Sequence, residues 1–599
     1  MSNKNLKQRN QIPNEYKWNI EAMFPDESQW EKNIAQCIER AGAFDQFRGK
    51  LTQTPKTLLA ALEERDDIWR KLEHAFVYSA MKKDEDNRMD KYQGMDDKCS
   101  SAIAKVSASM SFFTPELLEA SEEKILGFIN EEKGLKKYEF MLKSILREKD
   151  HVLSAAEENI LAQMSEVTGA TNDVFKMLNN ADMTFGTIED EDGEQVPLTH
   201  GNYITFMESP NRKVREAAFT NMYEAYKKLI NTLATNYNYN TKTDVVAARI
   251  RKYDSSLAAA LDGGNIPLDV YRNLIKEVRN YLPVVHKYMD IRKRVLGVDE
   301  LKMHDVYVPL VDTPKKPISF EDAIDMMVEG LAPLGDEYIN QVKAGIKEGW
   351  IDVYENQGKT SGAYSFGSYD SMPYILLNYT DTLKDVFTIV HEMGHSMHSF
   401  YTRETQPYTY GDHSIFTAEV ASTVNESLLI KHLLKVEEDE QMKKYLLNYC
   451  IEGFRTTLFR QTMFAEFELL AHEEIEKGEV LTAAWLNETY NQLNKDYFGP
   501  AMSDDDYIKY EWSRIPHFYR GFYVYQYATG YSAAEAISSK ILSEGPEARD
   551  NYLEFLKSGS SNYPVELLKI AGVDMTSPEP VKMAMETFKN LVDELGKLL

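Results

Sequence analysis

The segment VFTIVHEMGHSMHSF, residues 386–400, sets the strongest limit on how this chain folds. Its apolar residues step by four, three, four and three positions, which places them on one face of an α-helix; they are Val386, Val390, Met393, Met397 and Phe400. A stripe this apolar has to face a protein core, yet histidines and a glutamate stand within the same segment. The fold must therefore bury one side of this helix and give its titratable side chains a role.

His391 and His395 lie one helical turn apart, so their Cβ atoms are about 5–6 Å apart. Two imidazoles at that separation can bind one Zn²⁺ ion. Glu392 projects about 100° further round the helix, too far to be a ligand but able to reach a water on the open side of the metal. This is the H-E-x-x-H arrangement, in which the glutamate takes a proton from the water as the water attacks a carbonyl. Gly394 leaves one side of the helix bare, so another backbone can approach it.

The third metal ligand has to come from another part of the chain. The first helix is predicted to end near 405–406, and a second is predicted to begin at Ser414. A loop this short brings the start of the second helix back beside the first. Glu419 and Glu426 lie seven residues apart on nearly one face of it. The spacing leaves both as candidate ligands.

Two further residues of the first helix limit the possible class of site. His398 is interpreted as a packing residue or a support for the site, because three histidines in line along a helix make poor tetrahedral geometry. Tyr401 stands where the metzincin pattern requires a third histidine, so that class is excluded.

The rest of the chain predicts a mainly α-helical fold in more than one lobe. A length of 599 residues is more than one hydrophobic core usually supports, and apolar residues recur at helical spacing through most of the sequence, as in helical bundles. Asp192-Gly193 between two β-prone runs predicts a hairpin within residues 183–208. We place the boundary between two regions of the chain just after this hairpin, with an N-terminal helical region at 1–209 and a catalytic domain at 210–599.

A second β-prone region precedes the opening segment. Trp350–Tyr354, Ala363–Tyr369 and Pro373–Tyr379 predict three short strands of a small sheet beside the H-E-x-x-H helix. One interpretation is a sheet that only packs the neighbouring helices. The other is an edge strand that lines a cleft and pairs with an extended peptide.

Composition narrows the partners and the compartment. The net charge of −27, with a pI near 5.0, argues against a nucleic-acid partner. The three cysteines, Cys37, Cys99 and Cys450, have no metal-type spacing and fit a reducing compartment. The first 18 residues lack the apolar run of a secretory signal, and no apolar run reaches the ~20 residues of a membrane span. We expect a cytoplasmic protein without a membrane partner.

These motifs resemble those of one known family. HEMGHSMH, followed by the glutamate of FTAEVAS, is similar to the thimet oligopeptidase-like zinc metallopeptidases, and within them to the oligoendopeptidase F branch. The likeness extends to SGAYSFGSYDSMPYILLNY before the motif, to IPHFYRGFYVYQYATGYSAAEA after it and to YKWNIEAMFP near the N-terminus. It is strongest between residues 361 and 534.

The resemblance implies a fold, an activity and a set of site residues. It implies two helical lobes enclosing a deep substrate channel, and a zinc endopeptidase that cleaves internal bonds of short oligopeptides with one Zn²⁺ per chain. His391, His395 and Glu419 would be the metal ligands and Glu392 the general base, while Glu426 would orient a ligand histidine. The family's oxyanion donors are a histidine, which His517 matches, and tyrosines. Tyr519, Tyr523 and Tyr527 are spaced by four on one helix face, but this spacing differs from that of the thimet oligopeptidase branch, so the resemblance selects no single tyrosine. We favour Tyr523 and Tyr527; the alternative is an aromatic stripe packed into the core.

Two alternatives remain open from the sequence. A zinc carboxypeptidase or dipeptidyl carboxypeptidase uses the same ligands, and Arg514 or Arg520 could hold the terminal carboxylate of its substrate. The second alternative is a non-catalytic helical scaffold in which the motif arose by chance.

Overall fold

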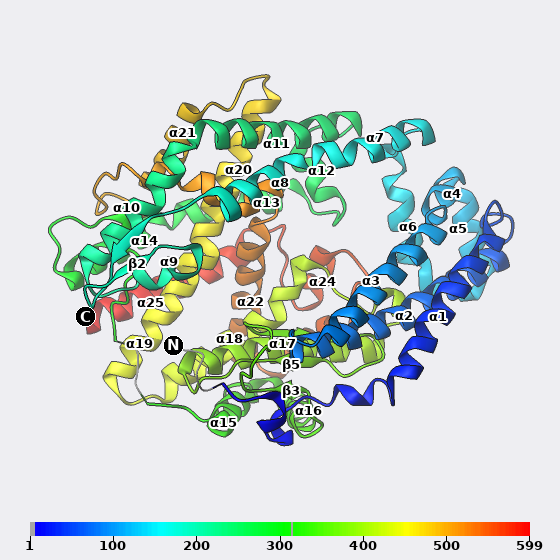
Figure 1. Cartoon of the computed structure of the whole chain (residues 1–599), viewed down its shortest axis with the longest axis horizontal. Helices are drawn as coiled ribbons and strands as arrows, with labels where there is room; N and C mark the ends of the chain where they lie inside the picture. Colours follow the sequence, from blue (N-terminus) through cyan, green and yellow to red (C-terminus); the bar gives the residue numbers. More distant parts are fainter. Residues whose placement is uncertain (1–5, 313–315) are drawn as a thin grey trace. The chain divides into compact units, whose positions relative to one another are not determined.

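The computed structural model describes residues 6–312 and 316–599, so the first five residues of the amino-terminal stretch lie outside the described part. The chain is mainly α-helical, as predicted, with helices α1–α25 and short strands β1–β5 (Figure 1). It forms two compact units. Unit 1 contains Met1–Lys149, Lys316–His432 and Ile537–Val573, and unit 2 contains Asp150–Lys315, Leu433–Ala536 and Asp574–Leu599. The units interleave along the chain, whereas the division at residue 209 separates consecutive segments, and that division stays a prediction.

The helices of unit 1 come from all three of its segments. They are α1 (Glu27–Ala43), α2 (Pro55–Glu85), α3 (Asp90–Met110), α4 (Phe113–Glu119), α5 (Glu122–Glu131), α6 (Glu139–Arg147), α15 (Phe320–Gly330), α16 (Gly335–Lys347), α17 (Leu383–Thr405), most of α18 (Ile415–Val436), α23 (Pro546–Leu556) and α24 (Pro564–Ile570).

The helices of unit 2 are likewise drawn from three segments. They are α7 (Ala155–Thr168), α8 (Ala170–Met177), α9 (His200–Met207), α10 (Arg212–Lys228), α11 (Ile230–Ile250), α12 (Ser256–Asp262), α13 (Leu268–Asn280), α14 (Leu282–Leu296), α19 (Glu440–Gly453), α20 (Arg460–Glu476), α21 (Ala483–Phe498), the first part of α22 (Tyr525–Glu544) and α25 (Glu579–Leu598).

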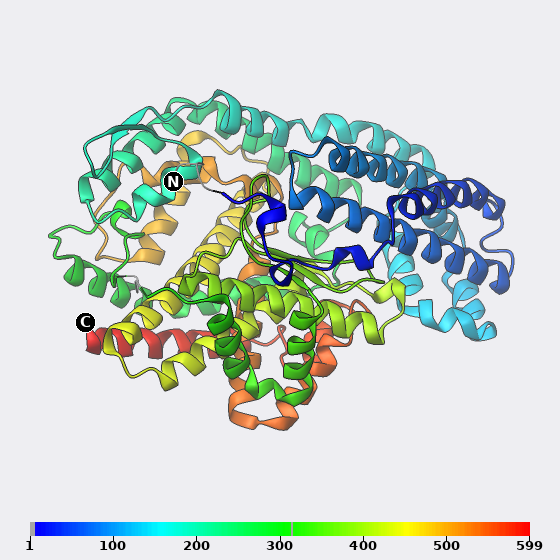
Figure 2. The same ribbon diagram turned by 60° about the horizontal axis from the view of Figure 1, so that its bottom comes forward.

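A three-helix layer begins unit 1. Helices α1, α2 and α3 pack against one another, and they run side by side in both views (Figures 1 and 2). The N-cap Thr54 and Pro55 in the first turn start α2, because proline fits the first helical position without losing a hydrogen bond. The apolar stripes of the three helices, with Trp30, Leu58 and Leu72 fully or almost fully buried, form one continuous core.

A small mixed sheet in unit 1 lies against the H-E-x-x-H helix. Its strands have the order β3 (Ile351–Asp352), β5 (Tyr374–Leu376) and β4 (Tyr364–Phe366), with β3 parallel and β4 antiparallel to β5. Helix α17 packs on β4 and β5, and α23 packs on α17, where Thr402 Oγ1 donates to the Leu556 carbonyl at 2.9 Å. The predicted sheet is therefore present, and β4 is an edge strand.

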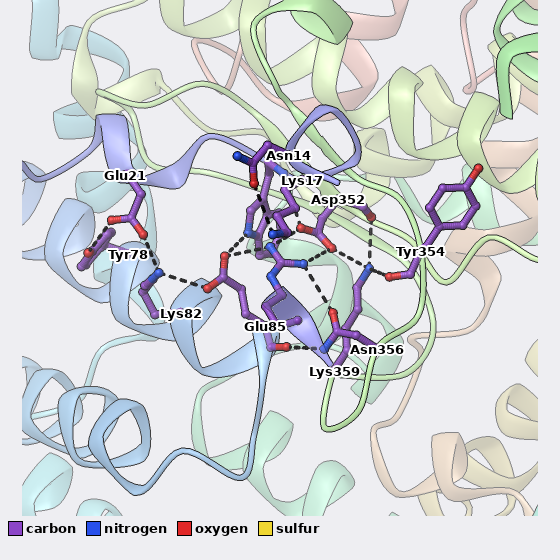
Figure 3. A network of polar contacts seen from close by, with 12 residues as sticks. Asn14, Lys17, Glu21, Tyr78, Lys82, Glu85, Asp352, Tyr354, Asn356 and Lys359 are labelled. Atoms are coloured by element: carbon purple, nitrogen blue, oxygen red, sulfur yellow. Dashed lines mark hydrogen bonds and ion pairs between the residues drawn. The ribbon is translucent and has the colours of Figure 1, made fainter. Parts of the chain in front are cut away.

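The amino-terminal segment covers the outer edge of β3 through a buried polar network. Arg9 donates to both carboxylate oxygens of Asp352 and to Glu85, and Lys359 contacts Asp352 at 2.7 Å. Asp352, Glu85 and Lys359 turn toward one another, and Lys359 also donates to the Tyr354 carbonyl (Figure 3). Asp352 and Lys359 are almost fully buried, so charge pairing is what allows these groups to stay ionised in the interior.

Unit 2 contains the predicted hairpin. Strands β1 (Thr187–Glu189) and β2 (Gln195–Pro197) pair antiparallel, and Gly193 in the connection takes a φ of 84° that glycine adopts without strain. Among the described helices, none combines the length and apolar character that crossing a membrane requires.

Candidate metal centre

Helix α17 buries one face in the core and leaves a second face partly exposed to solvent. Thr382 and Asp385 form a capping box at its start, which satisfies the free N–H groups of the first turn. The predicted stripe is buried, with Val386, Val390 and Met393 at 0% exposure. The side chains of His391 and His395 stay 28% and 19% exposed. The packing thus fixes the helix and leaves both imidazoles accessible.

A missing side chain lets α18 approach α17 between the two histidines. A Cβ on Gly394 would lie 2.5 Å from the Cα of Ser422 and 2.7 Å from the Ala421 carbonyl oxygen. No real Cβ tolerates such distances, so only glycine permits this packing of the two helices. The approach puts the first turns of α18 directly beside the histidine face.

The close approach brings Glu419 to the two histidines. Its Oε2 lies 3.4 Å from His391 Nε2 and 3.6 Å from His395 Nε2, and the two nitrogens are 3.2 Å apart. Three ligands of a tetrahedral zinc, each at ~2.0–2.1 Å from the ion, would be separated by about 3.3 Å. The three donors therefore fit a single zinc-sized ion, and they form the one such group of three found among the described residues.

Each donor is held by a second contact. His391 Nδ1 pairs with the carboxylate of Glu426, and His395 is hydrogen-bonded to the Ala418 carbonyl. The Ser422 hydroxyl donates to Glu419 Oε2 at 3.2 Å. Contacts of this kind fix the orientation and tautomer of metal-binding imidazoles. Between the two glutamates that the spacing left open, Glu419 faces the Nε2 atoms and Glu426 supports His391.

The charges around the imidazoles favour a cation. Burial opposes a charge on His391, but its hydrogen bonds with Glu419 and Glu426 outweigh burial and raise its pKa to about 10. Burial and the charge on His391 lower the pKa of His395 to about 4. The hydrogen bond from His391 lowers the pKa of Glu419 to about 2. The two carboxylates that stabilise a proton on His391 therefore also make this position favourable for a cation.

Glu392 is fastened to the sheet on the other side of the helix. It is only 8% exposed, and it accepts a hydrogen bond from the Ser365 backbone N–H of β4. Ser365 also contacts the Ser396 hydroxyl at 2.8 Å. Burial raises the pKa of Glu392 to about 7, against the opposing charge of His391. A carboxyl with a pKa near neutrality suits proton transfer in both directions.

His398 packs away from the three donors. Its ring stacks on His413 with centroids 4.2 Å apart and lies near Phe555. Burial lowers the pKa of His398 well below its ordinary value, which keeps the ring neutral. His398 thus has the packing role that the sequence suggested, and it ties the loop before α18 to α17.

His517, Tyr523 and Tyr527 belong to unit 2, where they form a ring cluster of their own. The His517 and Tyr523 rings are near parallel at 6.3 Å, and Tyr523 and Tyr527 are 5.5 Å apart. The two phenolic oxygens lie 3.5 Å from each other. Burial lowers the pKa of His517, so the ring is neutral near pH 7 and able to donate one hydrogen bond.

The two arginines considered for a terminal carboxylate are already engaged. Arg514 contacts Glu511 at 3.4 Å, and the Arg520 guanidinium lies 4.1 Å above the Tyr523 ring.

The sequence could not predict two contacts of this site, because they are made by backbone groups rather than by side chains. Ala418 and Ser365 act through backbone groups, which any residue provides. Gly394 carried a signal, because a glycine inside a buried helix needs a packing reason.

Comparison with known proteins gives matches over nearly the whole chain. The profile described as Peptidase family M3 matches residues 205–587, and the profile described as Oligopeptidase F matches residues 116–185. Oligopeptidase PepF of Bacillus subtilis (strain 168) is 47% identical over 594 residues, 99% of this chain and 89% of that protein. Group B oligopeptidase PepB of Streptococcus agalactiae is 42% identical over 591 residues, covering 99% of this chain and 98% of that protein.

Solved structures agree with these matches. Oligoendopeptidase-F from Enterococcus faecium superposes with a TM-score of 0.75 at 39% identity, over 96% of this chain and 99% of that one. A second solved structure comes from Chlamydophila abortus, and its name describes it as a peptidase. It superposes with a TM-score of 0.92 at 36% identity, over 99% of this chain and 100% of that one.

Proposed function

Because this chain belongs to peptidase family M3, a family of metallopeptidases, we propose that it uses one zinc ion to hydrolyse internal peptide bonds of short oligopeptides. It is a metalloendopeptidase, and the resemblance drawn from its motifs is confirmed. The names of the matched relatives support oligopeptides as the substrate class.

His391, His395 and Glu419 would hold the zinc ion. The single observation that carries the proposal is the convergence of their three donor atoms, at 3.2, 3.4 and 3.6 Å from one another. Two nitrogens and one carboxylate oxygen are a ligand set of catalytic zinc sites. When bound, the ion supplies Lewis acidity that lowers the pKa of a water towards ~7.

Glu392 moves the proton in this proposal. It takes a proton from the water as the water attacks the scissile carbonyl, and it passes that proton to the departing amine. Its pKa of about 7 suits both transfers, and the Ser365 N–H keeps the carboxylate oriented.

His517, Tyr523 and Tyr527 are proposed as donors to the oxyanion that develops during the attack. A neutral imidazole and two phenols supply N–H and O–H groups, and such donors stabilise the transition state more than the substrate. We also propose that β4 pairs with an extended substrate, since it is an edge strand and touches Glu392 through Ser365.

The cytoplasm remains the proposed compartment, because Cys37, Cys99 and Cys450 are all buried and their spacing gives no disulfide framework. The division at residue 209 likewise remains a proposal.

The test replaces the proposed base and keeps the ligands. Glu392→Gln is expected to bind zinc with the wild-type stoichiometry and to lose hydrolysis of an internally quenched peptide blocked at both ends. Glu404→Gln, an exposed site on the same helix, is the control and should cleave normally. Wild-type cleavage by Glu392→Gln would refute the assignment of the base. Failure of the wild-type enzyme to cut the blocked peptide would favour a carboxypeptidase.

A further inference from the structure

One residue of unit 2 holds a backbone conformation that its side chain disfavours. Phe522 has a φ of 56°, a left-handed geometry that is a genuine outlier for a bulky residue. It stands directly between Gly521 and Tyr523, the phenol proposed above as an oxyanion donor. Strained residues persist only where the surroundings determine them, and they concentrate at functional sites.

Three features of the surroundings hold Phe522 in this backbone conformation. Its backbone N–H donates to Glu468 Oε1 at 3.2 Å. Its ring, 4% exposed, packs against His472 at 4.3 Å and Tyr271 at 5.7 Å between centroids. Gly521 next to it is closely packed, since a Cβ there would lie 2.8 Å from Asp244 Oδ2 and 3.3 Å from His472 Nε2.

Glu468 is a buried acid that the proposed reaction does not use. It is 0% exposed on α20, and among the described residues its Oε2 has no hydrogen-bond partner. Burial raises its pKa well above the ordinary value, so the group is a neutral carboxylic acid. A buried acid with one oxygen unsatisfied is costly, and its one hydrogen bond goes to the strained residue.

The left-handed turn at Phe522 sets the position of the next residue, Tyr523. The ring of Tyr523 lies beside those of His517 and Tyr527, while Arg520 covers its face. A change of φ at Phe522 would rotate the chain that enters α22 and displace the Tyr523 ring from this cluster.

We propose that Glu468 is a positioning residue, which fixes the left-handed turn at Phe522 by accepting its N–H and thereby places the Tyr523 hydroxyl for oxyanion stabilisation. The inference rests on the role of Tyr523 in the proposed function. It assigns Glu468 no contact with substrate or metal.

A double-mutant cycle tests this coupling. Glu468→Leu removes the acceptor, and we expect kcat to fall about tenfold with KM within twofold of wild type. Glu468→Gln keeps a neutral carbonyl acceptor and should retain most of kcat. Tyr523→Phe should lower kcat by about 10²–10³-fold, the usual cost of one oxyanion donor. Adding Glu468→Leu to Tyr523→Phe should lower kcat no further, since Glu468 acts through the lost hydroxyl.

Two controls separate positioning from general damage. Glu277→Leu removes another buried acid of unit 2, 5% exposed on α13, and should leave kcat unchanged. Gly521→Ala disturbs the same turn from its other side and should reproduce the loss of kcat, which keeps the test available if Glu468→Leu does not fold.

The position of the ring can be followed independently of activity. With 3-fluorotyrosine at position 523, ¹⁹F NMR should give one sharp resonance in the wild type and in Glu468→Gln, and a shifted or split resonance in Glu468→Leu. Equal loss of kcat from Glu468→Leu in both backgrounds, or an unchanged resonance, would overturn the proposal. If Tyr523→Phe keeps full kcat, the catalytic role of Tyr523 fails, while the resonance still decides whether Glu468 positions the ring.

Discussion

Gly394 of α17 and Ser422 of α18 approach so closely that a Cβ on the glycine would lie 2.5 Å from the Ser422 Cα. We expect Gly394→Ala to push the helices apart, to weaken zinc binding at least tenfold and to cost about 1–3 kcal/mol of stability, as overpacked sites do. Zinc titration against a competing chelator and thermal unfolding measure both effects. Gly94→Ala in α3, where a Cβ meets nothing within 4 Å, should instead gain about 0.5–1 kcal/mol. Unchanged zinc affinity in Gly394→Ala would show that the spacing of the helices does not set the site.

The Glu426 carboxylate contacts Nδ1 of His391, and we expect this contact to orient the imidazole ring. Removing such a supporting carboxylate typically costs about 10–100-fold in metal affinity, so Glu426→Ala should weaken zinc binding by that factor and leave the stoichiometry at one. The same chelator competition measures it. Glu329→Gln, an exposed carboxyl 3.8 Å from His432, is the matched control. If Glu426→Ala bound no zinc at any zinc concentration tested, Glu426 would instead be a metal ligand.

The stability of unit 2 should depend on Glu511 at low pH. Burial disfavours its charge, but Arg460 and Arg514 outweigh burial and lower its pKa from 4.5 to about 2. As the pH falls, the unfolded chain binds the proton first, so about 3 kcal/mol of stability, fully present above pH 4.5, is lost towards pH 2. Glu511→Gln removes this pH-dependent part.

Denaturant unfolding from pH 7 to pH 3 checks this expectation. Glu511→Gln should be much less stable than wild type at pH 7, because it leaves Arg460 and Arg514 without their counter-charge, and the difference should narrow with falling pH. Glu488→Gln, exposed on α21, should show a constant difference. A gap for Glu511→Gln that stays constant down to pH 3 would contradict the pKa assignment.

Arg9 is expected to stabilise unit 1 by pairing with buried Asp352. Arg9→Ala leaves that carboxylate with Lys359 as its ion-pair partner and the Trp18 N–H as a donor. Breaking a buried pair costs about 3–5 kcal/mol, which thermal unfolding would detect. Arg48→Ala breaks an exposed pair, with side chains 51% and 66% accessible, and should cost under about 1 kcal/mol. Equal losses in both variants would mean that the Arg9 network adds nothing beyond a surface pair.

Local spacing was enough to bring together most residues of the candidate metal centre. The periodicity of residues 386–400 located α17, and the predicted second helix narrowed the third donor to Glu419 or Glu426. Spacing could not choose between them, because the choice depends on how deeply α18 approaches Gly394. The family resemblance favoured Glu419, whose Oε2 lies 3.4 and 3.6 Å from the two Nε2 atoms, and its role as a ligand stays a prediction.

The interleaved units and Glu468 were beyond the reach of the sequence. Periodicity reports which face of an element is buried, but it does not say which distant segment buries it. Residues 537–573 join unit 1 through contacts with segments more than a hundred residues away. In the sequence, nothing distinguishes Glu468 from other glutamates on helices. Its proposed role emerges only from the positive φ of Phe522 in the structure.

The packing of α23 on α17 also bears on how the enzyme is made. The ribosome has synthesised every proposed metal ligand by residue 419, yet the helix that packs against α17 is completed only at Leu556. Unit 1 is therefore completed late, after α23 has emerged, whereas the core that α1, α2 and α3 share contains no residue beyond 146. A chain that stops before α23 would carry the proposed ligands on a helix that lacks this packing partner.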